Sequence, residues 1–261
     1  MKPELFKIGD FFTVYAYGFF IAIGAILGVT YVAIQARKRF NISFDTINTL
    51  FLLLIVAAVV GGKVFLFFEK PGYYTDNPSA LFTGKGFVFY GSLIFTIPTM
   101  LIFFKKHNLP TLPMLDIMAV TTCIVHIFGR IGCFMAGCCY GIEWHGPLSV
   151  IFTDDQCLAP LNAPLHPTQL YSVTLITIIL IILLVIKRNK AFEGQLFILY
   201  LMLYAIGRSI IEIFRGDESR GYIIENVLSH SQFIALILFL IALYFYIRLS
   251  RQQKDKGSHT N

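Results

Sequence analysis

Charged residues are scarce in this chain. Only 14% of its 261 residues are Asp, Glu, Lys or Arg, whereas soluble domains contain about a quarter. Hydrophobic residues make up 56% of the sequence, and the mean hydropathy is +0.71. These proportions exclude an ordinary soluble globular domain and indicate an integral membrane protein.

The alternation of apolar and polar residues that is typical of outer-membrane barrel strands is also missing. The apolar stretches run continuously instead, and each approaches the roughly 20 residues that a helix needs to cross the hydrocarbon core. We therefore expect an all-α integral membrane protein of about seven transmembrane helices. The expected spans are residues 11–36, 46–68, 87–104, 115–134, 168–186, 195–214 and 227–249, and the third is the shortest.

The sequence shows no internal repeat and no low-complexity linker. A cleavable signal peptide is not expected, because residues 1–10 are mixed in character and the first apolar run is too long for one. The sequence thus predicts a single transmembrane domain over residues 1–250. The polar tail, residues 251–261, is expected to be disordered.

Lysine and arginine are distributed unevenly among the expected connections. Because these residues mark the cytoplasmic side, we expect the N-terminus outside and the C-terminus in the cytoplasm. The net charge of +6 comes mostly from this bias and argues against nucleic acid as a partner. The residues that define the cytoplasmic side are Arg37, Lys38, Arg39, Lys105, Lys106, Lys187, Arg188, Lys190, Arg248, Arg251, Lys254 and Lys256.

Polar side chains within the spans all fall in the outer half of the membrane in this orientation. Charges inside a bilayer cost at least a few kcal/mol each and persist where they pair or line a wet cavity. The alternative is that each side chain snorkels separately to the interface. We favour a shared polar site because the whole set lies on one side: Tyr17, Lys63, Tyr90, His126, Arg130, Cys133, His166, Gln169, Arg208, Glu212 and Arg215.

One motif in this set is Arg208-x-x-x-Glu212-x-x-Arg215. Spacings of four, three and seven place the three side chains on one helical face. A carboxylate between two guanidiniums can hold both and leave donors for an anion, and arginine matches two phosphate oxygens at once. An ion pair that only stabilises the helix end explains the spacing equally well.

A second motif runs from His126 through Arg130 to Gly141 and contains four glycines, Gly129, Gly132, Gly137 and Gly141. So many glycines favour close backbone approach and positive-φ turns. We therefore expect a break in the helix around Arg130, which is tolerated at membrane depth where it lines a cavity. A glycine-rich packing turn without chemistry is the alternative.

These motifs resemble the signature of the prolipoprotein diacylglyceryl transferase family. The resemblance rests on Gly129-Arg130-Ile131-Gly132, on the run from His166 to Tyr171, and on the arginine–glutamate motif. Tyr17-Gly18 and Gly61-Gly62 also match in order, and the resemblance covers nearly the whole chain.

The resemblance implies a bacterial plasma-membrane enzyme without a cofactor. Such an enzyme moves the diacylglyceryl group of phosphatidylglycerol to the lipobox cysteine thiol of a prolipoprotein signal peptide, and glycerol phosphate leaves. It also implies that Arg130 binds the headgroup, that Arg208 and Glu212 form an essential ion pair, and that Tyr17 and Gln169 line the pocket. Further substrate-binding candidates are Arg215, Gly129, Gly132 and Gly141.

Departures from the family pattern concern the group that takes the thiol proton. Many members have a histidine where this chain has Tyr90, and a tyrosine with a pKa of about 10 is a poor base. His126, one turn before Arg130, is the substitute candidate. Cys133 and Cys138 stand where the family usually has asparagine and glutamate, and Lys63 stands where it often has arginine.

The remaining question concerns the cysteines. Cys138 or Cys139 with Cys157 could form a disulfide on the outer side. A zinc site with His126, His145 or His166 is a lesser alternative, because the spacing matches no standard pattern, and we expect no metal. A nucleophilic cysteine is equally a minor alternative, and Cys123 is expected to be a packing thiol.

Two other functions compete with the transferase hypothesis. One is a related lipid-modifying enzyme with another acceptor. The other is a non-enzymatic transporter of lipids or anions, which the apolar inner halves of the spans disfavour.

Overall fold

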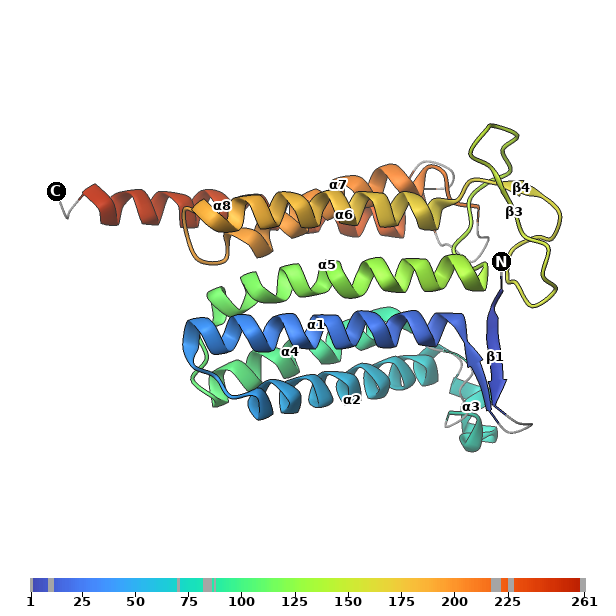
Figure 1. The fold of residues 1–261 in the computed structure, drawn as a ribbon, viewed down its shortest axis with the longest axis horizontal. Coiled ribbons are helices and arrows are strands. Elements are labelled where there is room, and N and C mark those ends of the chain that lie inside the picture. The colour runs from blue at the N-terminus through green and yellow to red at the C-terminus, as the bar shows by residue number, and fades with distance from the viewer. Residues whose placement is uncertain are drawn as a thin grey trace. The chain divides into compact units, whose positions relative to one another are not determined.

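The computed structural model describes residues 2–8, 12–69, 71–81, 86, 88–216, 222–224 and 228–258. The expected span ends at residues 11, 87 and 227 lie outside these ranges. The chain is mostly helical (Figure 1). It divides into two compact units, one formed by Met1–Tyr31 with Leu115–Asn261 and the other by Val32–Met114.

The first unit contains the helices that carry most of the candidate site residues. They are the start of α1 (Ala16–Phe40), nearly all of α5 (Thr111–Ala136), α6 (Thr168–Ile186), the short 3-10 helix η2 (Lys187–Asn189), α7 (Gln195–Glu212) and α8 (His230–Ser258). Three antiparallel strand pairs accompany them: β1 (Glu4–Ile8) with β2 (Phe12–Tyr15), β3 (Val150–Ile151) with β4 (Pro164–Leu165), and β5 (Tyr222–Ile224) with β6 (Leu228–Ser229).

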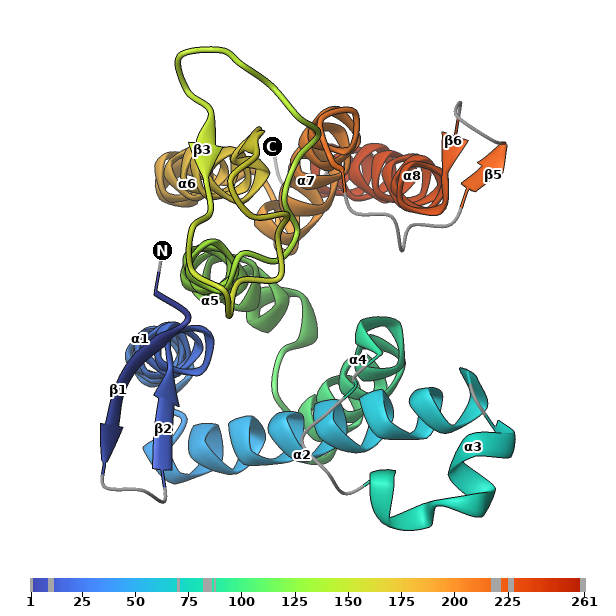
Figure 2. The same cartoon turned by 90° about the vertical axis from the view of Figure 1, so that its right-hand side faces the viewer.

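The core of this unit lies between α5, α6 and α7. Buried side chains from all three helices form one cluster: Ala119, Val120, Cys123, Ile176, Ile179, Leu183, Leu196 and Tyr200. Figure 2 looks along these helices and shows α7 between α6 and α8, in agreement with its contacts to both. The ends of α5 and α7 and the start of α6 therefore meet at one end of the unit, where the N-terminus also lies (Figure 1).

Helix α1 packs against α5 through glycines. A Cβ atom on Gly28 would lie 2.9 Å from the Val125 side chain, and one on Gly132 would lie 3.2 Å from the backbone of Tyr17. Small residues allow membrane helices to approach closely and to gain van der Waals contact. The glycines of this part of the chain thus serve helix packing.

The second unit is a helical hairpin with a small cap. It comprises α2 (Phe44–Glu69), α3 (Pro71–Asp76), the 3-10 helix η1 (Pro78–Leu81) and α4 (Phe89–Lys106). The crossing of α2 and α4 uses Gly61, where a Cβ atom would lie 2.8 Å from Phe95 Cβ. The Ser92 hydroxyl donates to the Ala58 carbonyl across this crossing at 2.8 Å.

Among the described residues, six helices are long and apolar enough to cross a membrane, which confirms an all-α integral membrane protein. They are α1, α2, α5, α6 with η2, α7 and α8. The remaining expected span, the third, forms α4, which has 18 residues and ends in Lys105 and Lys106, so the count of seven stays a prediction, as does the orientation. Helix α8 continues to Ser258, through residues where a disordered tail was expected.

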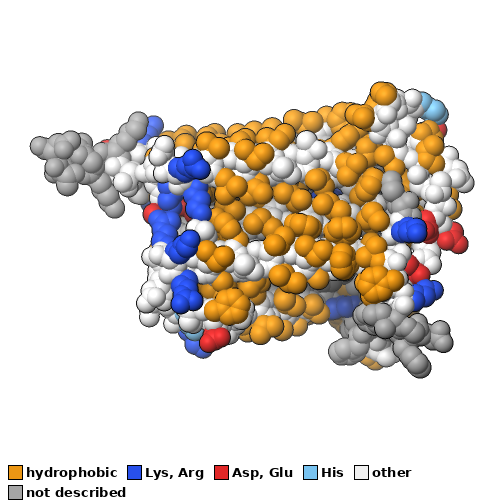
Figure 3. Space-filling view, viewed as in Figure 1, with side chains coloured by type: hydrophobic (Ala, Val, Ile, Leu, Met, Phe, Trp, Pro, Cys, Tyr) orange, Lys and Arg blue, Asp and Glu red, His pale blue; other side chains and the backbone are white. Residues whose placement is uncertain are grey.

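The surface of the helices suits a lipid environment. In Figure 3, hydrophobic side chains cover the helices along their length, and lysine and arginine side chains gather at the end where α8 finishes. Such a basic band agrees with the uneven charge distribution in the sequence.

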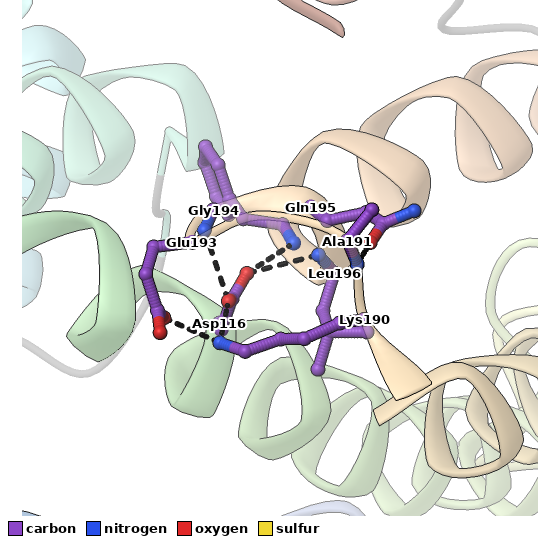
Figure 4. A network of polar contacts seen from close by, with 8 residues as sticks. Asp116, Lys190, Ala191, Glu193, Gly194, Gln195 and Leu196 are labelled. Atoms are coloured by element: carbon purple, nitrogen blue, oxygen red, sulfur yellow. Dashed lines mark hydrogen bonds and ion pairs between the residues drawn. The ribbon is translucent and has the colours of Figure 1, made fainter. Parts of the chain in front are cut away.

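A buried aspartate near the start of α5 holds the start of α7 (Figure 4). The arginine motifs lie at the other ends of these two helices. Asp116 is 2% exposed. Its Oδ1 accepts from the backbone N–H of Leu196 at 2.9 Å and of Phe197 at 3.2 Å, and its Oδ2 accepts from the Gly194 N–H at 2.9 Å and Lys190 Nζ at 2.7 Å. A carboxylate at a helix N-terminus satisfies N–H groups that have no partner within the helix.

We expect Asp116→Ala to destabilise the protein by about 3–5 kcal/mol, because it leaves the N–H groups of Gly194, Leu196 and Phe197 without their acceptor and removes one of the two carboxylates that contact Lys190. Thermal unfolding in detergent measures the effect. Asp155→Ala in an exposed loop is the matched control and should change stability by less than about 0.5 kcal/mol. Equal unfolding temperatures for the two variants would contradict this role of Asp116.

Candidate anion-binding site

Three arginines surround a small pocket in the first unit. The space among its lining atoms is about 170 Å³, part of which is open solvent. Its lining residues come from the end of α5, the turn after it, the start of α6 and the end of α7: Arg130, Cys139, Thr168, Ser172, Arg208, Ile211 and Arg215. Guanidinium and hydroxyl groups are all hydrogen-bond donors, which makes the pocket a candidate for holding an anion.

Arg130 is oriented by a neighbour one turn earlier on α5. Its Nε donates to His126 Nε2 at 3.3 Å, and the His126 ring packs against the Tyr204 ring with centroids 5.2 Å apart. The Nε2 atom of His126 is therefore the unprotonated nitrogen in this arrangement. The contact uses the Nε donor of the guanidinium, and the Arg130 side chain lines the pocket.

Arg208 is held from two sides. Its Nη1 lies 2.5 Å from Glu212 Oε2, in the ion pair that the spacing predicted, and its Nη2 donates to Ser231 Oγ on α8 at 3.3 Å. Glu212 is 5% exposed. Glu212 thus pairs with one of the three guanidiniums, and the charged side chains among the lining residues are all arginines.

Arg215 reaches the pocket from the segment that follows α7, because the helix ends at Glu212 and not at residue 214. Backbone hydrogen bonds tie this segment to the turn after α5: Ile142 N–H donates to the Phe214 carbonyl at 2.9 Å, and Gly216 N–H to the Tyr140 carbonyl at 3.1 Å. A Cβ atom on Gly141 would lie 2.6 Å from the His166 carbonyl oxygen. Only glycine fits there, so Gly141 acts through backbone packing.

The expected helix break around Arg130 is wrong. Helix α5 runs unbroken through Gly129, Arg130 and Gly132 to Ala136, because contacts with α1 stabilise the glycine-containing turns. The break comes at Gly137, which has φ +71. Gly137 N–H donates to the Phe134 carbonyl and Cys138 N–H to the Cys133 carbonyl, a Schellman ending of the helix.

The turn after α5 brings three cysteines together. The sulfur atoms of Cys133, Cys138 and Cys139 all lie within 4.8 Å of one another. The start of α6 fixes this turn, since Thr168 Oγ1 donates to the Cys139 carbonyl at 2.6 Å and Gln169 Nε2 to the Cys138 carbonyl at 2.7 Å.

Gln169 is fully buried beside this turn. Among the described residues, no donor lies within hydrogen-bond distance of its Oε1. A buried acceptor without a partner is unfavourable unless a ligand or water supplies the donor. Tyr17 lies against Gly132 with 44% of its surface exposed, and the space around Gly129 is open.

Two candidates belong to the second unit. Tyr90 is on α4 with 48% of its surface exposed, and Lys63 is on α2. The prediction that they share a site with Arg130 stays a prediction.

The remaining cysteine and histidine candidates have other surroundings. All five cysteines are described and are free thiols, so the structure contains no disulfide to Cys157. The His166 ring stacks on Trp144 with centroids 4.3 Å apart, and burial lowers the pKa of His166 below its usual range. His145 lies 3.6 Å from Glu143 on the surface. The cysteine cluster contains neither histidine.

Several pocket residues were not predicted from the sequence. Thr168 and Ser172 line the pocket from α6 and Cys139 from the turn, and Tyr204 supports His126. The spacing of four between Thr168 and Ser172 places both on one helical face, but hydroxyls at this spacing are common in helices. Only the fold distinguishes them.

The fold defines an integral membrane protein, and three arginines line a candidate pocket at the ends of its helices. Comparison with known proteins gives its family: the sequence profile described as prolipoprotein diacylglyceryl transferase matches residues 3–248, and the chain belongs to this family.

The relatives are bacterial proteins that match over nearly their whole length. A phosphatidylglycerol–prolipoprotein diacylglyceryl transferase of Clostridium tetani is 36% identical over 247 residues, which cover 94% of this chain and 97% of the relative. The protein of the same name from Dehalococcoides mccartyi is 30% identical over 260 residues, with 100% and 98% covered. A relative from Clostridium perfringens is also 30% identical, over 255 residues.

Proposed function

We propose that this protein transfers the diacylglyceryl group of phosphatidylglycerol to the cysteine thiol of a prolipoprotein lipobox in the bacterial plasma membrane. The pocket with its three arginines is the observation that carries the proposal. The chain belongs to a family whose named members act on these two substrates. The arginines of the pocket suit the phosphate of an anionic lipid.

The reaction increases negative charge at the phosphate. The thiolate sulfur attacks the diacylglyceryl carbon, a C–S bond forms, and the bond from this carbon to the phosphate oxygen breaks. The phosphodiester carries one negative charge, and the departing glycerol phosphate carries two until it is protonated. Arg130, Arg208 and Arg215 would stabilise this developing charge, because fixed cations act most strongly where charge appears in the transition state.

Other residues would position the lipid. Thr168 and Ser172 offer hydroxyl donors to phosphate oxygens. Gln169 Oε1 would accept a hydrogen bond from a hydroxyl of the glycerol headgroup. Tyr17, Gly129 and Gly132 would line the approach of the lipid, and Gly141 would keep Arg215 close to α6.

His126 is a positioning residue in this proposal. Its Nε2 lone pair accepts from Arg130, so it is engaged and cannot also take a thiol proton. We expect His126→Leu to lower kcat/KM by about 10- to 100-fold, which corresponds to the roughly 1–3 kcal/mol of an unsatisfied donor, and His126→Gln to recover part of the loss.

The pH profile separates this role from that of a base. A positioning role lowers the rate at every pH and leaves the shape of the kcat profile unchanged. Loss of the acidic limb in His126→Leu alone would instead identify His126 as the general base.

The function is tested with the purified protein in nanodiscs that contain labelled phosphatidylglycerol. A peptide with a lipobox cysteine should gain the mass of a diacylglyceryl group, with one glycerol phosphate released per product. A peptide with serine at that position and nanodiscs of phosphatidylcholine are the controls. Absence of product with folded protein and several lipobox peptides would overturn the proposal, and movement of intact lipid across the bilayer would favour a transporter.

A further inference from the structure

We propose that Cys133, Cys138 and Cys139 form a zinc site that leaves one coordination position for the acceptor thiol. The inference rests on the proposed transferase function. It assigns a role to the three clustered thiols, and it supplies what the pocket lacks among its lining residues, a means of generating the thiolate.

The geometry of the cluster matches the demands of the metal. Zinc binds thiolate sulfur at about 2.3 Å with tetrahedral angles, which separates neighbouring sulfurs by about 3.8 Å. The three sulfur atoms already lie within 4.8 Å of one another, so small side-chain rotations would bring them to a common ion. Three protein ligands with one open position are typical of catalytic zinc, whereas structural zinc has four.

The turn is built to bring these thiols together. Side chains of consecutive residues usually point apart, but Cys139 has φ +58 and Gly137 has φ +71. A positive φ at a residue other than glycine is uncommon, and such strain is concentrated at functional sites. Hydrogen bonds from Thr168 and Gln169 to the carbonyls of Cys139 and Cys138 hold this conformation.

The position beside the pocket links the metal to the reaction. Cys139 lines the pocket together with Arg130 and Arg215. Three thiolates and Zn²⁺ carry one net negative charge, which the surrounding guanidiniums offset. A thiol that binds to the open position would therefore lie next to the phosphate of the lipid.

The metal makes the thiol nucleophilic without a protein base. Zinc ligands bind as thiolates, so coordination releases the thiol proton to water. The coordinated sulfur then attacks the diacylglyceryl carbon, the C–O bond to phosphate breaks, and glycerol phosphate leaves with the electron pair. The thioether product is neutral and binds the metal more weakly than the thiolate, which frees the open position.

Metal binding is measured on the full-length protein in detergent with a reductant. After removal of metal with a chelator, Zn²⁺ should bind with one ion per chain, and Co²⁺ should give thiolate-to-metal absorption. Cys133→Ser, Cys138→Ser and Cys139→Ser should each weaken Zn²⁺ binding by about 100-fold or more, since even second-shell changes lower metal affinity 10- to 100-fold. Cys157→Ser is the matched control and should bind as the unaltered protein does.

The open position is tested with the Co²⁺ form of the unaltered protein, so no variant needs to fold. Adding the lipobox peptide should change the visible absorption of Co²⁺, and the serine peptide should not. An unchanged spectrum, or the absence of stoichiometric Zn²⁺ and Co²⁺ binding with all thiols reduced, would overturn the zinc site.

Transfer assays separate this inference from the proposed function. Chelation should lower product formation at least about tenfold, and added Zn²⁺ should restore it. Equal product with and without metal would overturn the inference and leave the transferase standing. Stoichiometric metal binding without product in any metal state would overturn the transferase instead.

Discussion

Arg130→Lys should lower kcat/KM for diacylglyceryl transfer by about 100- to 1,000-fold, the range typical of losing one transition-state donor. Lysine keeps the positive charge but lacks the planar fork that matches two phosphate oxygens. It also lacks the Nε donor that binds His126 Nε2 at 3.3 Å, so the remaining charge would not be held in place. Rates with labelled phosphatidylglycerol and a lipobox peptide measure the effect.

The matched control is Arg188→Lys, the same substitution at the other end of α6. Arg188 lies in η2 and is exposed, about 30 Å along the helix axis from Thr168 by helix rise. It should keep full activity. Activity of Arg130→Lys within about twofold of this control, at equal unfolding temperature, would show that the geometry of Arg130 does not matter and would contradict its proposed role.

The sequence was sufficient to locate the arginines, because charged residues stand out in apolar spans and their helical spacing shows which of them share a face. Arg208 and Glu212 are four residues apart, and the structure confirms their ion pair. Arg130 was identified by its charge within an apolar span and by the family motif. Both lie on helices whose existence follows from continuous hydrophobic runs.

Features that depend on distant segments could not be predicted. Asp116 on α5 accepts a hydrogen bond from Gly194, which follows 78 residues later. The residues near Asp116 in the sequence do not indicate this contact. Glycine spacing suggested a break at Arg130, but glycine next to a packed helix is compatible with a regular helix, and only the contact of Gly132 with Tyr17 decides between the two.

The cysteine cluster shows the same limit. Spacings of five and one match no common zinc pattern, because such patterns assume that the chain between ligands follows a standard turn. Here the positive φ angles of Gly137 and Cys139 bring adjacent side chains to the same side. Side chains from α6 hold that turn, and their partners cannot be read from local sequence.

Glu212→Gln should destabilise the protein by about 3–5 kcal/mol, because it leaves the buried Arg208 guanidinium without its counter-charge. Transfer activity should fall as well, since Arg208 would turn away from the pocket. Thermal unfolding in detergent and the peptide assay measure the two effects on the same preparation.

The double variant Arg208→Met with Glu212→Gln separates stability from function. Removing both charges replaces an unpaired buried ion by neutral groups, which is often close to neutral for stability, so the unfolding temperature should recover relative to Glu212→Gln. Activity should not recover, because the guanidinium that would stabilise the leaving phosphate is missing. If the double variant regained both, the ion pair would serve only the end of α7, and the pocket would have to act through Arg130 and Arg215 alone.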